Sequence, residues 1–303
     1  MRNQTLSVVV PSRNEGRRLR QTVSEIVDGD LGTGITLREV IIVDDQSSDG
    51  SAEGEFPSIV KVVRPDKRLG VARAKNFGAT FVTGDFVVWS DAHIGVPPGW
   101  AAQLIDELKA EDVGAVSPGI QGMEADSRIG YGGTWATGDP SLNWRWLSKA
   151  GTAAYEVPLL PGGFMAMRRD VLERTQGFDG KLGTWGEEDV EISLRLWAMG
   201  LKCLAIPDVA VRHAFKSDAG VTSDGGMLIY NKLRVAALHL PDERFTAFVQ
   251  RIRRIREFPD AMTRFIRSDT LHRREELERT RVRPREWIID RFSLGPVFDD
   301  SPA

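Results

Sequence analysis

The residues of this chain that could do chemistry stand at the ends of apolar runs. The run "FVVWSDAH" stops at Asp91 and places His93 two positions later. Residues i and i+2 of an extended segment point to the same side, so a carboxylate and an imidazole could hold one divalent cation. His213, which ends the run "VAVRH", is a candidate third ligand. Mixed oxygen and nitrogen ligands suit Mn²⁺, with Mg²⁺ as a second choice, whereas the triplet alone is more typical of a turn Asp beside a surface His.

Acidic and polar side chains also follow the first two apolar runs. "REVIIVDD" ends in Asp44 and Asp45, and "LSVVVP" leads into "PSRNE". Asp and Ser favour turns and helix N-caps, which accounts for Ser47, Ser48 and Asp49 but does not require two carboxylates directly after a buried strand. Asp44 could instead accept hydrogen bonds from an imide N–H or a hydroxyl of a ligand. The candidates after the first run are Pro11, Ser12, Arg13 and Glu15.

Three consecutive acids, Glu187, Glu188 and Asp189, begin the clearest helical pattern of the chain, residues 187–200. Acidic side chains in a first helical turn are favoured by the helix dipole, by about 0.3–1 kcal/mol each. That effect explains one or two of the three. The alternative is that Glu188 or Asp189 is a general base that takes a proton from a substrate hydroxyl.

Four tryptophans lie in the segments of least regular pattern: Trp135, Trp144, Trp146 and Trp185. Aromatic faces stack on sugar rings, and they also fill the interiors of loop-rich regions, so both interpretations stay open.

The elements that must position these residues alternate along the first 118 residues. Continuous β-branched runs indicate buried strands, and apolar residues at helical spacing indicate the helices between them. This alternation predicts βαβ units, a mostly parallel sheet and an α/β fold with ligands at the carboxyl ends of the strands. Strands are expected at 6–11, 38–45, 58–64, 85–91, 113–118, 162–169, 201–207 and 209–213, and helices at 14–27, 70–82, 97–110 and 187–200.

Composition narrows the class of protein. The chain has 303 residues, a net charge of −3 and one cysteine, Cys203, so it can form no internal disulfide and is not suited as a whole to bind nucleic acid. Residues 244–291 hold fourteen arginines against eight acids, which indicates either a solvated helical face or a surface for an acidic partner. The beginning of the chain lacks a signal-peptide pattern and no apolar run is long enough to span a membrane, so a cytoplasmic location is expected.

Two nucleotide-binding signatures are absent from the sequence. No G-x-G-x-x-G follows the first strand, which argues against a dinucleotide-binding Rossmann site. No G-x-x-x-x-G-K-[ST] occurs, which argues against a P-loop.

Several motifs together resemble a known family. "VVVPSRNE", "IIVDDQSSDGS", "LGVARAKNFGA" and "GDFVVWSDAH" are similar to the nucleotide-binding half of GT-A glycosyltransferases of the family 2 type. The segment from "PGGFMAMRR" to "VAVRHAFK" resembles the polypeptide N-acetylgalactosaminyltransferases. The resemblance covers roughly residues 6–235. It implies a GT-A α/β/α sandwich and a metal-dependent transfer of sugar from a nucleotide-sugar donor, with UDP as the expected nucleotide.

The resemblance also implies roles for particular residues. Asp91, His93 and His213 match the metal ligands, and Asp44 matches a residue that contacts the base. Gly162 and Gly163 would allow close approach of the donor sugar, and Trp185 would belong to a mobile lid. Positions matching donor-binding residues are Arg73, near the nucleotide, and Lys216, where the family has an arginine on the diphosphate.

The acid motif departs from the one it resembles. The family's Trp-Gly-Gly-Glu-Asn is here Trp185-Gly186-Glu187-Glu188-Asp189, which adds one carboxylate and replaces an amide with an acid. Inverting family 2 enzymes have "Glu-Asp" at this place, so the stereochemical outcome of the reaction stays open.

The expected organisation is a catalytic domain over 1–235, followed by an Arg-rich helical extension over 236–303. The catalytic domain would consist of a nucleotide-binding half, 1–118, and an acceptor half, 119–235. The acceptor could be a peptide, a secondary metabolite or a glycan. Two alternatives are a sugar nucleotidyltransferase, for which "PSRNEGRRL" lacks the usual glycine-rich loop, and a non-catalytic nucleotide-sugar-binding protein.

Overall fold

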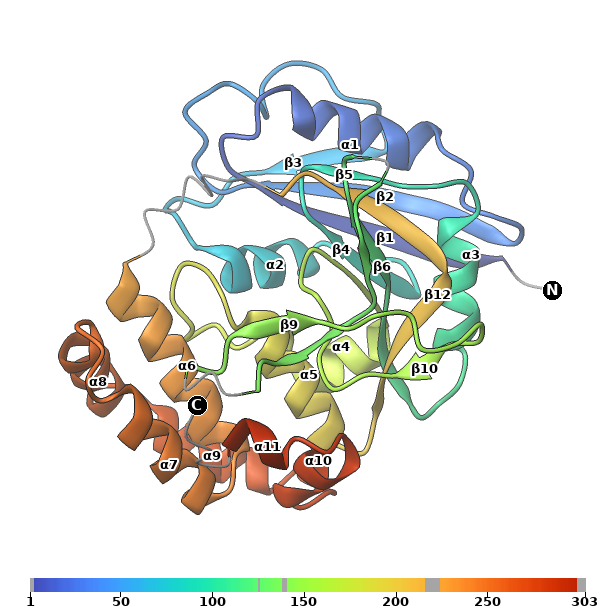
Figure 1. Cartoon of the computed structure of the whole chain (residues 1–303). Helices are drawn as coiled ribbons and strands as arrows, with labels where there is room; N and C mark the ends of the chain where they lie inside the picture. The colour runs from blue at the N-terminus through green and yellow to red at the C-terminus, as the bar shows by residue number, and fades with distance from the viewer. Residues whose placement is uncertain (1–2, 125, 138–140, 216–223, 299–303) are drawn as a thin grey trace.

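The centre of the protein is a ten-stranded mixed sheet (Figure 1). The computed structural model describes residues 3–124, 126–137, 141–215 and 224–298. The strands of the large sheet are β1 (Gln4–Ser12), β2 (Ile35–Asp44), β3 (Val60–Val63), β4 (Phe86–Ser90), β5 (Ile94–Gly95), β6 (Val113–Gly122), β7 (Ile129–Gly130), β10 (Tyr155–Glu156), β11 (Phe164–Arg168) and β12 (Lys202–His213). A separate pair consists of β8 (Gly133–Trp135) and β9 (Trp144–Trp146).

The strand order confirms the predicted α/β class. The main path runs β10-β12-β6-β11-β4-β1-β2-β3. β1 is parallel to β2 and β4, β2 is parallel to β3, and β6 is parallel to β12. β11 runs antiparallel to both of its neighbours, β4 and β6. The sheet is therefore mostly parallel, and the inverted β11 begins at the carboxyl end of β4, next to Asp91.

Helices cover both faces of the sheet. They are α1 (Arg17–Asp28), α2 (Val71–Ala79), α3 (Trp100–Leu108), α4 (Arg169–Thr175), α5 (Glu188–Ala198), α6 (Gly225–His239), α7 (Asp242–Ile252), α8 (Phe258–Ile266), α9 (Thr270–Glu278), α10 (Glu286–Arg291) and α11 (Gly295–Phe298). Successive side chains of a strand point to opposite faces, so Val8 and Val10 of β1 pack in the cluster of α1 and α3, whereas Val9 packs in the cluster of α2 and α5.

The two strands expected at 201–207 and 209–213 form one strand, β12. Its pairing with β6 shifts register between Ile206 and Ala210, around Pro207. Proline has no N–H to donate to a sheet ladder, and a bulge accommodates it without ending the strand. The continuous strand carries His213 to the edge of the sheet where β4 ends.

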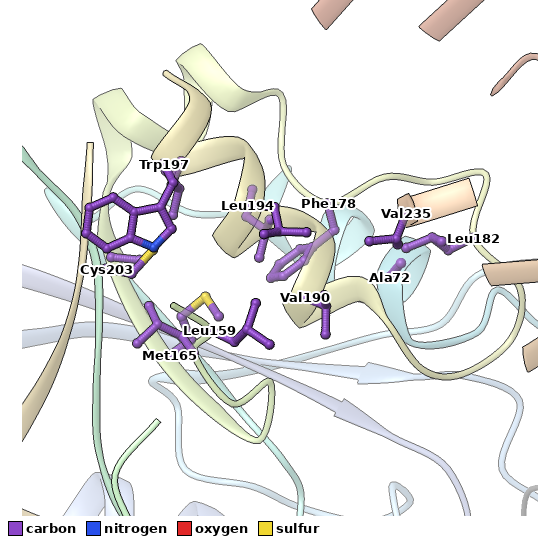
Figure 2. Close-up of a cluster of buried hydrophobic side chains, with 14 of the residues drawn as sticks. Ala72, Leu159, Met165, Phe178, Leu182, Val190, Leu194, Trp197, Cys203 and Val235 are labelled. Atoms are coloured by element: carbon purple, nitrogen blue, oxygen red, sulfur yellow. The ribbon is translucent and has the colours of Figure 1, made fainter. Parts of the chain in front are cut away.

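Helix α5 rests on a large apolar cluster that fixes its position below the sheet. Val190, Leu194 and Trp197 are buried on this helix, at the helical spacing that the sequence predicted. Figure 2 shows them beside Met165 of β11 and Phe178. This packing places the amino end of α5, with its acids, at the same strand ends as Asp91.

The C-terminal helices α6 to α11 pack against the face that holds α2, α4 and α5 (Figure 1). One apolar cluster includes Phe248 and Ile289 of this region together with Val9 and Trp197. The predicted boundary at residue 235 falls inside α6. None of the helices in the described part of the chain combines the length and the apolar composition of a membrane-spanning helix.

Candidate active site

A cavity of about 890 Å³ opens at the carboxyl ends of β1 and β4 and beside the amino end of α5. Its walls come from the turn after β1, the start of α2, the hairpin β8–β9 and the segment between α4 and α5. The predicted site residues that line it are Pro11, Ser12, Arg13, Glu15, Asp91, His93, Gly162, Gly163, Trp185, Glu188, Asp189 and His213.

Asp91, His93 and His213 meet at one point of this cavity. Their possible ligand atoms all lie within 4.8 Å of one another. Asp91 Oδ2 is 3.1 Å from His213 Nε2 and 3.9 Å from His93 Nε2. Pairing of β5 with β12 sets Ile94 opposite His213, which brings the two imidazoles together across 120 residues of sequence. Two imidazole nitrogens and one carboxylate oxygen form a donor set that fits Mn²⁺.

The electrostatics of the cluster keep Asp91 ionised. Burial alone would raise the pKa of Asp91, but the hydrogen bond from His213 and the charges of both histidines lower it to about 2. An ionised carboxylate is the form that binds a metal. On the far side of the cluster, Glu15 Oε2 lies 3.1 Å from His93 Nδ1. Such a carboxylate fixes the orientation of a ligating imidazole and leaves Nε2 free to bind.

Gly162 and Gly163 permit the close packing at this point. A Cβ at Gly163 would lie 3.1 Å from Asp91 Oδ2 and 3.3 Å from His213 Cδ2. A Cβ at Gly162 would lie 3.0 Å from Glu188 Oε1. The carbonyl of Gly163 accepts a hydrogen bond from the Asp91 amide at 2.8 Å. The two glycines therefore allow the candidate metal ligands Asp91 and His213 to lie close to the acids of α5.

Glu188 forms a buried ion pair that sequence reasoning missed. Lys75 Nζ on α2 lies 3.0 Å from Glu188 Oε1 and donates to the carbonyl of Gly162 at 2.9 Å. Burial alone would lower the pKa of Lys75, but the charges of Glu188, Asp91 and Asp189 raise it. The burial of Lys75, though not its partner, could have been inferred from the sequence, because Lys75 stands three residues after the inward-facing Ala72 on the same helix.

Asp189 is held by backbone amides and has a proton affinity suited to neutral pH. Its Oδ2 accepts a hydrogen bond from the Gly162 N–H at 2.9 Å, and its Oδ1 accepts one from Val190 at 2.9 Å. Burial, together with the charge of Glu188, raises the pKa of Asp189 to about 7. A carboxylate with that pKa can accept a proton from a hydroxyl near neutral pH.

Glu187 is a third carboxyl in the cavity wall. Its backbone has φ 70°, a left-handed conformation that follows Gly186 at φ 90°. Burial raises the pKa of Glu187 to about 8, against the lowering effect of Lys232. Such a conformation is costly for a residue other than glycine and marks the turn that precedes α5.

Two predicted residues, Asp44 and Arg73, do not line the cavity, and a third lies outside the described residues. Asp44 is fully buried, accepts a hydrogen bond from Ser47 N–H at 2.9 Å and pairs with Arg64. Arg73 is exposed and donates to the carbonyl of Leu69. Lys216 lies outside the described residues. The neighbour of Asp44, Asp45, lines the cavity instead.

The side chain of Asp45 binds the backbone immediately before α2. Its two oxygens accept hydrogen bonds from the amides of Leu69 and Gly70, at 2.6 and 2.9 Å. Both predicted carboxylates therefore have structural partners in this region, and Asp44 itself does not line the cavity. Sequence reasoning also missed Arg18, Arg68 and Lys232 as lining residues.

Aromatic rings form the wall opposite the acids. The Trp144 and Trp146 ring centroids are 5.3 Å apart, and Trp146 lies 6.3 Å from Phe215. Phe215 lies 4.3 Å from the imidazole of His213. These contacts join the rings of Trp144 and Trp146 to the candidate metal ligand His213 through Phe215. Trp185, another aromatic residue of the cavity wall, is 46% exposed.

Comparison with known proteins decides the family. The model of glycosyl transferase family 2 matches residues 7–175, more than half of the chain. The chain belongs to glycosyl transferase family 2. A second model, described as the N-terminal domain of galactosyltransferase, matches residues 149–216. The two matches include every cavity-lining residue of this family 2 chain except Leu228 and Lys232 of α6.

Two curated relatives are polypeptide N-acetylgalactosaminyltransferases. Number 11 of Xenopus tropicalis is 30% identical over 281 residues, which is 85% of this chain and 46% of the relative. Number 3 of Homo sapiens is 28% identical over 272 residues, which is 82% of this chain and 42% of the relative. The family 2 chain thus spans less than half the length of these relatives.

A solved structure shows the same fold. The crystal structure of GalNAc-T7 with UDP, GalNAc and Mn²⁺ superposes with a TM-score of 0.79 at 23% sequence identity. The alignment covers 96% of this chain and 57% of that one. The predicted GT-A-like fold, including the C-terminal helices, is therefore confirmed.

Proposed function

We propose that this chain is a metal-dependent glycosyltransferase that moves a sugar from a UDP-linked donor to a hydroxyl of an acceptor. The observation that carries the proposal is that Asp91, His93 and His213 face the acids Glu188 and Asp189 in one cavity. UDP-N-acetylgalactosamine and a peptide hydroxyl are the first donor and acceptor to test, because the relatives are named for that transfer.

Each residue of the site has a chemical task in this proposal. Asp91, His93 and His213 would hold Mn²⁺, and a divalent cation neutralises the charge that develops on a departing diphosphate. Asp189 accepts the proton of the acceptor hydroxyl as the anomeric carbon is attacked. Lys75 keeps Glu188 in place beneath the Gly162 carbonyl. The rings of Trp144 and Trp146, packed edge to face, provide an apolar part of the cavity wall for the acceptor.

The test measures UDP release from UDP-sugars with Mn²⁺ and with EDTA. EDTA and the substitutions Asp91→Ala and His213→Ala should each lower the rate by about a hundredfold or more, since a metal contributes several kcal/mol to transition-state stabilisation. His272→Ala is the matched control, because His272 is 70% exposed on α9. Full turnover by His213→Ala would refute the metal assignment.

Two other outcomes would replace the proposal. Release of pyrophosphate from a sugar 1-phosphate and a nucleoside triphosphate would identify a nucleotidyltransferase. Binding of UDP without hydrolysis or transfer of any UDP-sugar would identify a non-catalytic binding protein.

A further inference from the structure

Residues 183–186, the part of the loop around Trp185, are hydrogen-bonded to helix α6 by the side chain of Asn231. Asn231 is completely buried. Its Oδ1 accepts a hydrogen bond from the Gly183 N–H at 2.7 Å, and its Nδ2 donates to the carbonyls of Trp185 and Gly186 at 3.0 and 2.9 Å. Both amide hydrogens and the amide oxygen of Asn231 are thus used on three residues of the four-residue stretch 183–186.

The glycines of this loop let it lie directly on α6. A Cβ at Gly183 would fall 2.1 Å from Met227 Cγ, and a Cβ at Gly186 would fall 2.9 Å from Leu228 Cδ1. A second fastening holds the middle of the loop, because the carbonyl of Thr184 accepts a hydrogen bond from Val71 of α2. Asn231 therefore holds Gly183 on one side of Thr184, and Trp185 and Gly186 on the other.

The bonded stretch and the residue after it form part of the cavity wall. Trp185, Gly186 and Glu187 all line it, and Trp185 is about half exposed at its mouth. The neighbouring Lys232, also buried, donates to the carbonyl of Ser141 and so holds the opposite wall, next to the hairpin β8–β9. One turn of α6 therefore positions two walls of the cavity.

We propose that Asn231 is a positioning residue that sets the place of Trp185 at the mouth of the cavity and thereby the affinity for the donor. The proposal rests on the proposed function, because it requires that a UDP-sugar binds in this cavity. Without the three hydrogen bonds, the loop occupies further conformations. The apparent dissociation constant for the donor then rises, because the intrinsic value is divided by the fraction of molecules that keep Trp185 in place.

The main experiment compares Asn231→Ala with the wild-type chain, using UDP-N-acetylgalactosamine and Mn²⁺. Three buried hydrogen bonds are lost, so we expect the donor KM to rise by about tenfold or more, with kcat at saturating donor changed less than about threefold. Asn231→Asp keeps the size of the side chain and the bond to Gly183 but loses both donors. It should raise KM in the same way, and it serves if the alanine variant does not fold.

The matched control is Asn76→Ala. Asn76 makes a comparable pair of side-chain hydrogen bonds with the backbone of Phe178, at 2.8 Å each, a few residues before the Trp185 loop. Asn76 does not line the cavity. Its substitution should leave the donor KM unchanged, and an equal rise in KM would overturn the proposal.

A double-mutant cycle with Trp185→Ala tests whether Asn231 acts through that ring. In the Trp185→Ala background, Asn231→Ala should add little to the donor KM, because residues that act as a unit are not additive. Fully additive effects, or a fall in kcat with unchanged KM, would show a merely structural role and overturn the proposal.

A ligand-free measurement separates this proposal from the proposed function. The contribution of Trp185 to the fluorescence is obtained by subtracting the signal of the matching Trp185→Phe chain. Quenching by acrylamide then measures how exposed the Trp185 ring is. Asn231→Ala should change this difference and Asn76→Ala should not. A wild-type chain that turns over no UDP-sugar would refute the proposed function, and unchanged Trp185 fluorescence in Asn231→Ala would independently refute the positioning role.

Discussion

Asp189 is the residue whose protonation should govern the pH dependence of catalysis. Its raised pKa of about 7 means that the carboxyl is protonated below neutral pH and ionised above it. A general base must be ionised, so kcat/KM should rise with pH and level off above about pH 7. Asp189→Asn keeps an acceptor for the Gly162 amide but removes the base. It should lower kcat by about 10²–10⁴-fold and abolish this pH dependence.

The control for this variant is Asp170→Asn. The side chain of Asp170 is 57% exposed on α4, so this substitution should leave the rate unchanged. Steady-state rates of both variants and the wild-type chain over pH 5–9 would show whether Asp189 is the general base. If Asp189→Asn kept both the rate and the pH profile, the proton would have to leave through another group.

At the scale of elements, α2 and α5 are joined across the sheet edge by Lys75 and Glu188. The lysine side chain is 1% exposed and the glutamate 10%, so water screens the pair little. Lys75→Met leaves a buried carboxylate without its partner and should lower the free energy of unfolding by about 3–5 kcal/mol. Glu188→Gln in the same chain removes that charge and should restore most of the loss.

Urea denaturation of the single and double variants measures this coupling. Lys109→Met is the control, because Lys109 and its partner Asp106 are exposed on α3 and such pairs contribute about 1 kcal/mol or less. A double variant no more stable than Lys75→Met would contradict the assignment of the loss to an unpaired Glu188.

Strands and helices with a regular pattern of apolar residues could be predicted from the sequence, whereas the elements without such a pattern could not. The runs that became β1, β2 and β4 are buried on both faces, so their sequences are continuously apolar. The short strands β7 to β10 carry no such pattern, because contacts with distant segments hold them: Gly133 pairs with Leu159, and Tyr131 with Leu147. Residues 119–160 therefore could not be assigned from periodicity.

The same distinction applies to the site. Asp91, His93 and His213 were found because each follows a strand, and strand ends meet at one edge of a parallel sheet. Lys75 and Asn231 lie within helices, and their partners are 113 and 45–48 residues away. Nothing in local sequence indicates such a pairing. Asp44 and Asp45 also could not be told apart, since consecutive residues of a strand end face opposite ways.

At the scale of the whole molecule, the arginines of the C-terminal region have two environments. The Arg281 side chain is only 9% exposed and donates to the carbonyl of Leu238 in α6, and Arg283 donates to the carbonyls of Trp197 and Gly200 at the end of α5. Arg253 and Arg254 are exposed. Part of the charge that the sequence predicted on a solvated face thus lies inside, where it ties the C-terminal helices to the elements that carry the site.

Substitution of Arg283 therefore tests whether the chain unfolds as one unit or whether the region after residue 235 unfolds separately. Its guanidinium lies 4.1 Å from the Trp287 ring centroid and 5.2 Å from that of Trp197, besides capping α5. Arg283→Met loses these contacts and should lower the free energy of unfolding by about 2–4 kcal/mol, whereas the exposed Arg254→Met should not. Because one apolar cluster spans both regions, far-ultraviolet circular dichroism and tryptophan fluorescence should report a single, shifted transition. An early transition in Arg283→Met that leaves UDP-sugar turnover intact would instead establish 236–303 as an independent extension.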